Sequence, residues 1–170
     1  MKKLLAIAFA ILCITSTVVP ADETILGEWV TEEGKSHVVI SECEAGLCGN
    51  IIWIKELTYP ADDEKGMAGK TRIDRENPDP ALQNRPLIGL QFLNGFKAQN
   101  DNIWEDGRIY DPENGETYKC KMTLVNPNTL NVRGYIGFSW LGRTTVWTRP
   151  EQKQADSLKD NTKLQLDELS

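Results

Sequence analysis

The chain has 170 residues, and 19 lysines and arginines stand against 25 aspartates and glutamates, which gives a formal net charge of −6. This length fits a single domain with one hydrophobic core. An acidic protein has no electrostatic reason to favour nucleic acid or an anionic membrane, and we expect no nucleic-acid partner.

The N-terminal 21 residues have the three-part form of a secretory signal. Lys2 and Lys3 precede an apolar run over residues 4–14, and small residues lead to Ala21. We predict cleavage after Ala21 and a periplasmic or secreted mature chain. The apolar run is too short to cross a bilayer, so we expect no stable membrane span. The mature chain would carry 17 basic and 25 acidic side chains, a net charge of −8.

Three short β-like runs open the mature chain, over residues 25–31, 37–41 and 49–54. Cys43 and Cys48 enclose four residues between the second and third runs, and export favours a disulfide between them. Cys120 is the remaining cysteine of the mature chain. Because it shares a strand face with apolar side chains, we predict a buried and unreactive thiol.

Regular patterning stops over residues 55–86, where charges, prolines and glycines follow no period of 2 or 3.6. A loop of about thirty residues inside a compact domain is uncommon, and such loops are usually lids, binding loops or disordered insertions. Its second half contains Asn-Pro-Asp-Pro at residues 77–80, which is turn chemistry, and residues 81–82 suit a short helical turn. We therefore predict an ordered cap.

The rest of the chain, as far as Arg149, reads as a ladder of short hairpins. Strand character resumes over residues 87–93, and Asn94-Gly95 predicts a two-residue hairpin turn. Further turns are predicted at 111–115, 126–128 and 141–142, with a strand over residues 130–140.

These elements predict an all-β fold, an up-and-down antiparallel barrel of about eight strands with a long cap loop. The barrel domain would span residues 22–150. Residues 151–170 are polar and charged without a β pattern, so we expect a C-terminal tail outside the barrel.

Two sets of residues resemble known families. Gly27 and Trp29 on the first strand, with Arg149 near the end of the last strand, are similar to the lipocalin-type barrels, where such a Trp packs at the closed end and an Arg lies across it. A more specific set is Leu47-Cys48-Gly49, Asn77-Pro78-Asp79-Pro80, Arg85-Pro86-Leu87-Ile88-Gly89, Ile109-Tyr110-Asp111-Pro112-Glu113-Asn114-Gly115, Val132-Arg133-Gly134-Tyr135, Leu141-Gly142-Arg143 and Trp147-Thr148-Arg149. In that order it resembles an exported bacterial family, domain of unknown function number twenty-one forty-seven, over residues 25–149. The resemblance implies a lipocalin-like barrel and brings no established reaction, ligand or catalytic residue.

A closed barrel of about eight strands either fills itself with side chains or holds one small ligand. Aromatic walls with a few polar groups are typical of small-molecule sites, although any single Trp more often belongs to a packed core, where we place Trp29 and Trp147. An inward arginine would fix an anionic head group, whereas an outward one would only meet water. The candidate ligand-binding residues are Trp53, Arg85, Tyr110, Tyr118, Arg133, Tyr135, Trp140 and Arg143, and the candidate cap residues are Asp74, Asn77 and Asp79.

Enzymatic patterns are weak in this sequence. His37 is the only histidine, and no Gly-x-Ser-x-Gly motif is present. Zinc ligands at workable spacing are also missing. We therefore expect a non-enzymatic binding protein for a small hydrophobic or amphipathic ligand, with no cofactor and no metal. The alternatives are an envelope interaction module with a filled barrel and, third, an enzyme that uses cap carboxylates.

Overall fold

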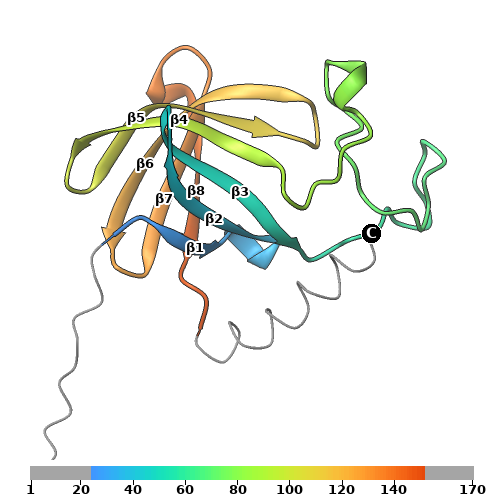
Figure 1. Ribbon diagram of the computed structural model, residues 1–170, viewed down its shortest axis with the longest axis horizontal. Coiled ribbons are helices and arrows are strands. Elements are labelled where there is room, and N and C mark those ends of the chain that lie inside the picture. The colour runs from blue at the N-terminus through green and yellow to red at the C-terminus, as the bar shows by residue number, and fades with distance from the viewer. Residues whose placement is uncertain (1–23, 152–170) are drawn as a thin grey trace, which may run out of the picture.

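The computed structural model, which describes residues 24–151, is a closed barrel of eight antiparallel strands (Figure 1). The strands are β1 (Gly27–Val30), β2 (Ser36–Cys43), β3 (Gly46–Ile54), β4 (Gln91–Asn100), β5 (Ile103–Asp111), β6 (Glu116–Asn126), β7 (Thr129–Tyr135) and β8 (Gly142–Thr148). Each strand pairs with the next in sequence, and β8 closes the barrel on β1 through Val30 and Thr148. This order confirms the up-and-down barrel. The predicted signal segment, and the predicted tail beyond residue 151, lie outside the described residues.

Period-two alternation determines which side chains fill the barrel. In β6 the side chains of Cys120, Met122 and Leu124 are buried, whereas Lys119 and Val125, on the opposite face of the strand, are exposed. Burial of this kind removes apolar surface from water, which is the main favourable term in folding. Cys120 is buried as predicted, and burial raises the pKa of its thiol to about 12.

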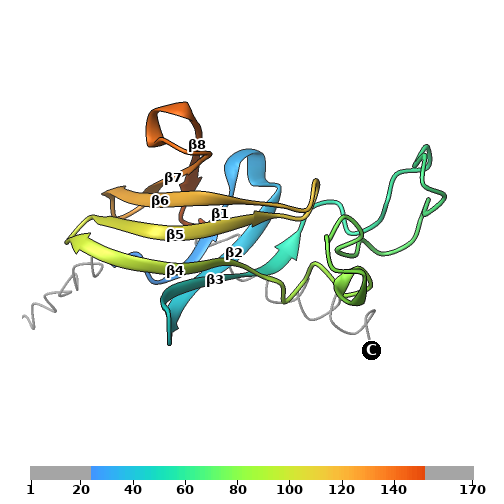
Figure 2. The same cartoon turned by 90° about the horizontal axis from the view of Figure 1, so that it is seen from above.

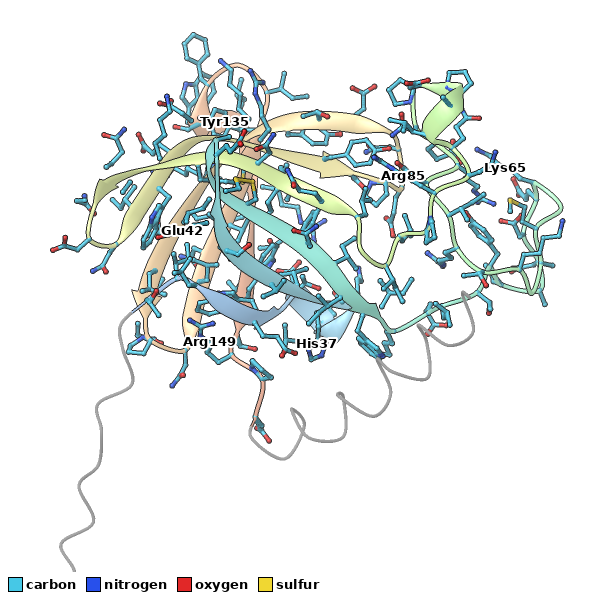
Figure 3. All side chains as sticks on the ribbon, viewed as in Figure 1. His37, Glu42, Lys65, Arg85, Tyr135 and Arg149 are labelled. Carbon is cyan, nitrogen blue, oxygen red and sulfur yellow. A yellow bond between two sulfur atoms is a disulfide. The ribbon has the colours of Figure 1, made fainter. Side chains whose placement is uncertain are left out.

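Trp29 and Arg149 seal one end of the barrel. The indole Nε1 of Trp29 donates to the carbonyl of Ile25 at 2.8 Å, and the guanidinium carbon of Arg149 lies 3.9 Å from the centre of the Trp29 ring. Arg149 also donates to the carbonyls of Glu28 and Leu26, each at 2.9 Å. Figure 3 labels Arg149 at this end, beside β1. The sequence expectation of a Trp covered by an Arg at the closed end is confirmed.

The β2–β3 hairpin carries the predicted disulfide. Cys43 and Cys48 are bonded, and their Cα atoms lie 5.9 Å apart. Gly46 follows the turn with a φ of 119°, and a Cβ there would lie 2.2 Å from the carbonyl oxygen of Phe96 in β4. The disulfide therefore links the two strands of the hairpin, and the start of β3 packs closely against β4.

The expectation of a hairpin turn at Asn94-Gly95 is wrong, because both residues lie inside β4. Leu93 and Phe96 are both buried, at 0% and 1% exposure, although strict alternation would place residues three apart on opposite faces. Gly95 resolves the conflict with a φ of 79°, a left-handed conformation that bends the strand so that both side chains face inward. The Asn-Gly pair thus makes an irregularity within a strand, and the turn comes at residues 101–102.

The predicted strand over residues 130–140 is also shorter than expected. β7 ends at Tyr135, and residues 136–141 form a loop that ends in a short 3-10 helix, Ser139–Leu141. Gly137 has a φ of 71°, a left-handed conformation that turns the chain away from the direction of β7. The apolar character of this stretch came from side chains that are exposed on the loop and do not pack in the barrel.

The long connection between β3 and β4, residues 55–90, forms the cap at the opposite end from Arg149. In an up-and-down barrel the β1–β2, β3–β4, β5–β6 and β7–β8 connections all lie at one end, and residues of all four connections line the cavity described below. Figure 2 shows the cap extending beyond the ends of β5 and β6. The predicted helical turn is present as a 3-10 helix, Pro80–Leu82, with the Asp79 carboxylate accepting from the Ala81 amide.

Another 3-10 helix, Glu32–Gly34, lies in the β1–β2 connection. Within residues 24–151 no helix is long and apolar enough to cross a membrane.

Candidate ligand-binding site

A cavity of about 980 Å³ lies between the barrel interior and the cap. Its volume falls at the upper end of the range for small-molecule sites, roughly 300–1,000 Å³. The closed end is filled by the packed core around Trp29, so the cavity occupies the open half of the barrel. The barrel is therefore partly filled and partly hollow.

The deep wall of the cavity is apolar. Phe92 of β4 and Trp147 of β8 are 9% and 3% exposed, and their rings stack with centroids 6.1 Å apart. Both line the cavity together with Ile51, Ile109 and Val132, which come from three further strands. Contact with such a wall removes the apolar surface of a ligand from water, which favours binding of an apolar ligand. The wall provides few hydrogen-bonding groups for a polar ligand.

The rim of the cavity is charged. Arg143 at the start of β8 donates to Glu32 of the β1–β2 connection at 2.8 Å, and both residues line the cavity. Lys55, where the cap begins, and Arg72 within the cap also line it. The site therefore changes from apolar in the barrel to charged at the mouth, which suits a molecule with an apolar body and a polar end.

A buried carboxylate anchors the cap to the barrel. Asp74 is 0% exposed and accepts from Arg85 Nε and Nη2, each at 2.8 Å, and from Asn77 Nδ2 at 2.7 Å. The hydroxyl of Tyr110 in β5 donates to the same carboxylate at 2.5 Å. Burial and this hydrogen bond raise the pKa of Tyr110 to about 12, which keeps the hydroxyl protonated as a donor. Buried charges require partners of this kind, and here the partners join the cap to a barrel strand.

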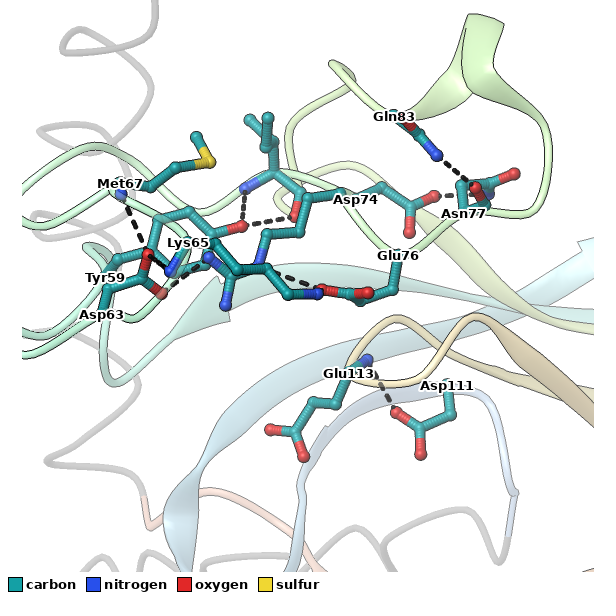
Figure 4. Close-up of polar contacts among 12 residues, drawn as sticks. Tyr59, Asp63, Lys65, Met67, Asp74, Glu76, Asn77, Gln83, Asp111 and Glu113 are labelled. Atoms are coloured by element: carbon teal, nitrogen blue, oxygen red, sulfur yellow. Dashed lines mark hydrogen bonds and ion pairs between the residues drawn. The ribbon is translucent and has the colours of Figure 1, made fainter.

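A second polar cluster orders the first half of the cap (Figure 4). The Arg75 guanidinium lies 4.0 Å from the centre of the Tyr59 ring and donates to Asp63 at 2.6 Å. A hydrogen bond from the Met67 amide, followed by the contact with Arg75, holds the pKa of Asp63 below its usual value. Glu76 binds Lys65, and that contact lowers the pKa of Glu76. The ordered cap predicted from the second half of the loop is confirmed, and these contacts order the first half as well.

The β5–β6 turn packs closely against the backbone of the cap. Gly115 has a φ of 76°, and a Cβ there would lie 2.0 Å from the carbonyl oxygen of Glu76. Glycine is therefore needed at this position both for the backbone conformation and for the close approach. Figure 4 labels Asp111, the last residue of β5, and Glu113 of this turn, lower in the view than the cap residues.

Four of the predicted binding residues line the cavity, namely Tyr110, Tyr118, Tyr135 and Arg143. The Tyr118 hydroxyl accepts from Asn114 Nδ2 at 3.1 Å, which fixes its polar tip near the β5–β6 turn. Figure 3 labels Tyr135 at the end of β7, near the loop that follows it.

The other predicted residues have different surroundings and do not line the cavity. Asp74, Asn77 and Arg85 form the cap anchor, and Asp79 caps the 3-10 helix Pro80–Leu82. Their contacts stabilise the cap loop and its attachment to the barrel.

Trp53, Arg133 and Trp140 also lie away from the cavity wall. The Trp53 ring meets the buried His37 ring edge to face, with centroids 5.1 Å apart. Arg133 donates to the carbonyl of Ser139, and Trp140 is 72% exposed on the β7–β8 loop. Alternation places Arg133 on the outer face, opposite the buried Val132.

Sequence reasoning missed most of the cavity wall. Trp147 was assigned to the core alone, yet it is also the floor of the cavity, and Phe92 was not singled out. Period-two alternation marks both as inward-facing, but it does not separate the filled half of a barrel from the hollow half. Tyr59 and Arg75 of the cap were missed because a cap without a period gives no signal of which side chains face the barrel.

The closed barrel with Trp29 and Arg149 at one end and a cavity at the other is a lipocalin-like fold. The structure is similar to that of the Helicobacter pylori protein HP1028, described as belonging to the lipocalin family, with a TM-score of 0.66 and 23% identity over 80% of this chain and 89% of that chain. At this identity the similarity concerns the fold.

The chain belongs to the bacterial family described as "Uncharacterized protein conserved in bacteria (DUF2147)", whose model matches residues 27–149. The resemblance found in the sequence motifs is thereby confirmed. No curated protein sequence matches the chain closely enough to count as a relative. The disulfide between Cys43 and Cys48 indicates a location outside the reducing cytoplasm.

Proposed function

We propose that this protein is an exported, non-enzymatic binding protein that holds a small hydrophobic or amphipathic molecule in its barrel. The observation that carries the proposal is the cavity of about 980 Å³, apolar in its depth and charged at its rim. A filled barrel that served only as a scaffold would lack this space. The disulfide and the signal-like residues 1–21 support a periplasmic or secreted location.

The cavity suits an apolar chain inserted from the mouth. Each methylene removed from water contributes roughly 0.8 kcal/mol, which is about a fourfold gain in affinity. A polar or charged head group would remain at the rim, where Arg72, Lys55 and Arg143 are within the cavity lining. Burial of the chain supplies the affinity, and the rim limits how far the head can enter.

Two groups that often act in catalysis lie elsewhere. His37 does not line the cavity, and its Nδ1 lies 2.7 Å from Glu28 Oε1. Cys120 does not line it either, and its raised pKa leaves it a thiol at neutral pH. These placements support binding and not chemistry in the barrel.

The first test is native mass spectrometry of protein purified from the cell, followed by titration with a series of fatty acids of increasing chain length. We expect a bound molecule, and an affinity that rises about fourfold per methylene until the cavity is full. An affinity that is independent of chain length would contradict burial of the chain.

A substitution at Gly134 tests the location of the ligand. A Cβ at Gly134 would lie 3.5 Å from Ile109 Cγ2 and 3.9 Å from Tyr118 Cβ, which are ordinary contacts with two cavity-lining residues. Gly134→Phe therefore fills the cavity from its wall, and we expect it to abolish binding of long chains while the barrel stays folded by circular dichroism. Asn131→Phe, on the outer face of the same strand, is the matched control and should bind normally. Equal binding by the two variants would place the ligand outside the barrel.

A further inference from the structure

The β7–β8 loop, residues 136–141, presents four large apolar side chains to solvent. Ile136, Phe138, Trp140 and Leu141 are 71%, 67%, 72% and 58% exposed. Only three other large apolar side chains are exposed in residues 24–151, and they are scattered. Scattered exposed apolar residues are ordinary, whereas a contiguous group marks an interaction site.

The loop is held in shape and does not fold back into the cavity. Arg133 donates to the carbonyls of Ser139 at 2.6 Å and Trp140 at 3.3 Å, and to the Thr144 hydroxyl at 2.8 Å. The Phe138 and Trp140 rings stack with centroids 6.2 Å apart. Figure 2 shows the loop projecting from the barrel between β7 and β8. The aromatic rings are therefore presented outward by a fixed backbone.

The loop is continuous with the mouth of the cavity. Ile136 and Leu141, at its two ends, line the cavity as well as facing solvent. Whatever covers the loop therefore also lies at the entrance to the barrel.

A group of basic side chains flanks the loop on the outer face of β5, β6 and β7. Arg108 of β5 pairs across the sheet with Lys119 of β6, and Lys119 pairs with Tyr135, the last residue before the loop. Lys121 pairs with Arg133 in the same way. Among these four basic residues, the described contacts give an acidic partner only to Lys121, whose Nζ lies 3.7 Å from Glu105.

This basic face has the opposite sign to the protein as a whole. The net charge of −6 argued against an anionic membrane, but charges farther away than about 8–10 Å are largely screened at physiological salt. The sign of the charges next to the loop therefore determines which kind of surface the loop binds. The strand register brings these basic residues together, although they are distant in sequence.

We propose that the β7–β8 loop and this basic face dock the mouth of the barrel on an anionic phospholipid bilayer. Trp and Phe side chains are suited to the membrane interface, where the apolar ring is buried among lipids and the polar edge stays wet. Flanking Lys and Arg attract anionic head groups. A loop of six residues is too small to bury the roughly 1,200 Å² that a stable protein interface needs, which favours lipid over a second copy of the chain. The docking does not depend on the ligand proposed above, although it would point the cavity mouth at the bilayer.

The test is co-sedimentation of the exported protein with vesicles of phosphatidylglycerol and phosphatidylethanolamine, compared with phosphatidylcholine alone. We expect binding to the anionic vesicles that weakens as salt is raised. Phe138→Ser with Trp140→Ser should reduce binding at least tenfold, because the inserted rings are lost. The matched control is Val125→Ser, which removes an apolar side chain 55% exposed in β6 near the closed end and should change nothing.

A second pair of variants tests the charges. Lys119→Ala should weaken binding about fivefold, since each basic residue near an anionic surface contributes about that much. Lys97→Ala, at an exposed position of β4 near the turn at residues 101–102, on the opposite end of the barrel from the loop, should have no effect. Failure of the unaltered protein to bind anionic vesicles overturns the proposal, and so does an equal loss in Val125→Ser or Lys97→Ala. A dimer that dissociates in the Phe138/Trp140 variant would instead assign the loop to a second copy.

The same variants distinguish the membrane-docking proposal from the proposal that the barrel binds a ligand. Binding of a short-chain fatty acid in the absence of vesicles should be unchanged in the Phe138/Trp140 variant. If the unaltered protein binds vesicles through the loop but binds no fatty acid, the docking stands and the ligand proposal fails. If it binds fatty acid but no vesicle, the ligand proposal stands and the docking proposal fails.

Discussion

Asp74→Asn should release the cap from the barrel without unfolding the barrel. The substitution keeps the size of the side chain but removes the charge that Arg85 and the Tyr110 hydroxyl bind at 2.8 and 2.5 Å. Breaking a buried ion pair costs about 3–5 kcal/mol, and the Arg85 side chain is 37% exposed and can turn to water, which lowers that figure. We therefore expect cap docking to weaken by about 2–4 kcal/mol.

Hydrogen exchange measures this directly. The Asp74 amide donates to the Arg85 carbonyl at 3.0 Å and the Asn77 amide to the Asp74 carbonyl at 3.0 Å, so both report on the anchor. A loss of about 2–4 kcal/mol corresponds to exchange about thirtyfold to a thousandfold faster at these amides. The amides of β6 should keep their protection, because the barrel core around Met122 is untouched.

Two further variants test whether the faster exchange comes from the loss of the Asp74 contacts. Tyr110→Phe removes one hydrogen bond to the carboxylate and should cost about 1.5–3 kcal/mol at the same amides. Asp62→Asn, at an exposed cap position, is the control and should leave exchange unchanged. Unchanged exchange at the Asp74 and Asn77 positions in Asp74→Asn would refute the anchor. Equal acceleration in β6 would show that the cap and barrel unfold together.

Two other expectations concern the closed end and alkaline pH. Arg149→Lys should lower the free energy of unfolding by about 2–3 kcal/mol in urea titrations. A lysine ammonium cannot donate hydrogen bonds to several carbonyls and cover the Trp29 ring at the same time. A loss below about 0.5 kcal/mol would contradict this. The pKa of Tyr110 is raised from 10.0 to about 12, so its contribution to stability is intact below pH 10 and is lost as the pH rises toward 12. Thermal melts across that range should show a smaller decline in Tyr110→Phe than in the unaltered protein, and identical declines would argue against it.

Much of the barrel could be predicted from local sequence. Alternating apolar residues and turn chemistry predict the strands and their antiparallel order, because both depend on residues a few positions apart. The disulfide between Cys43 and Cys48 was predicted from the short spacing of the two cysteines together with the predicted secretory signal. Trp29 and Arg149 are far apart in sequence, and only the resemblance to lipocalin-type barrels joined them.

Other features required the assembled barrel. Asn94-Gly95 has the pattern of a turn, yet it bends a strand because Leu93 and Phe96 must both enter the core. Asp74 meets Tyr110 across 36 positions, and no local pattern in the cap indicates that pairing.

The sequence by itself determined that the chain forms about eight antiparallel strands, which face of a regular strand such as β6 is apolar, and that a long cap follows β3, although β4 begins at Gln91 and not at residue 87 as predicted. The tertiary structure alone decided which inward side chains fill the barrel and which surround a cavity, since that depends on the summed volumes of side chains from different strands. It also decided that Arg108, Lys119 and Lys121 lie beside the apolar loop, because strand register, and not sequence distance, sets which charges are neighbours.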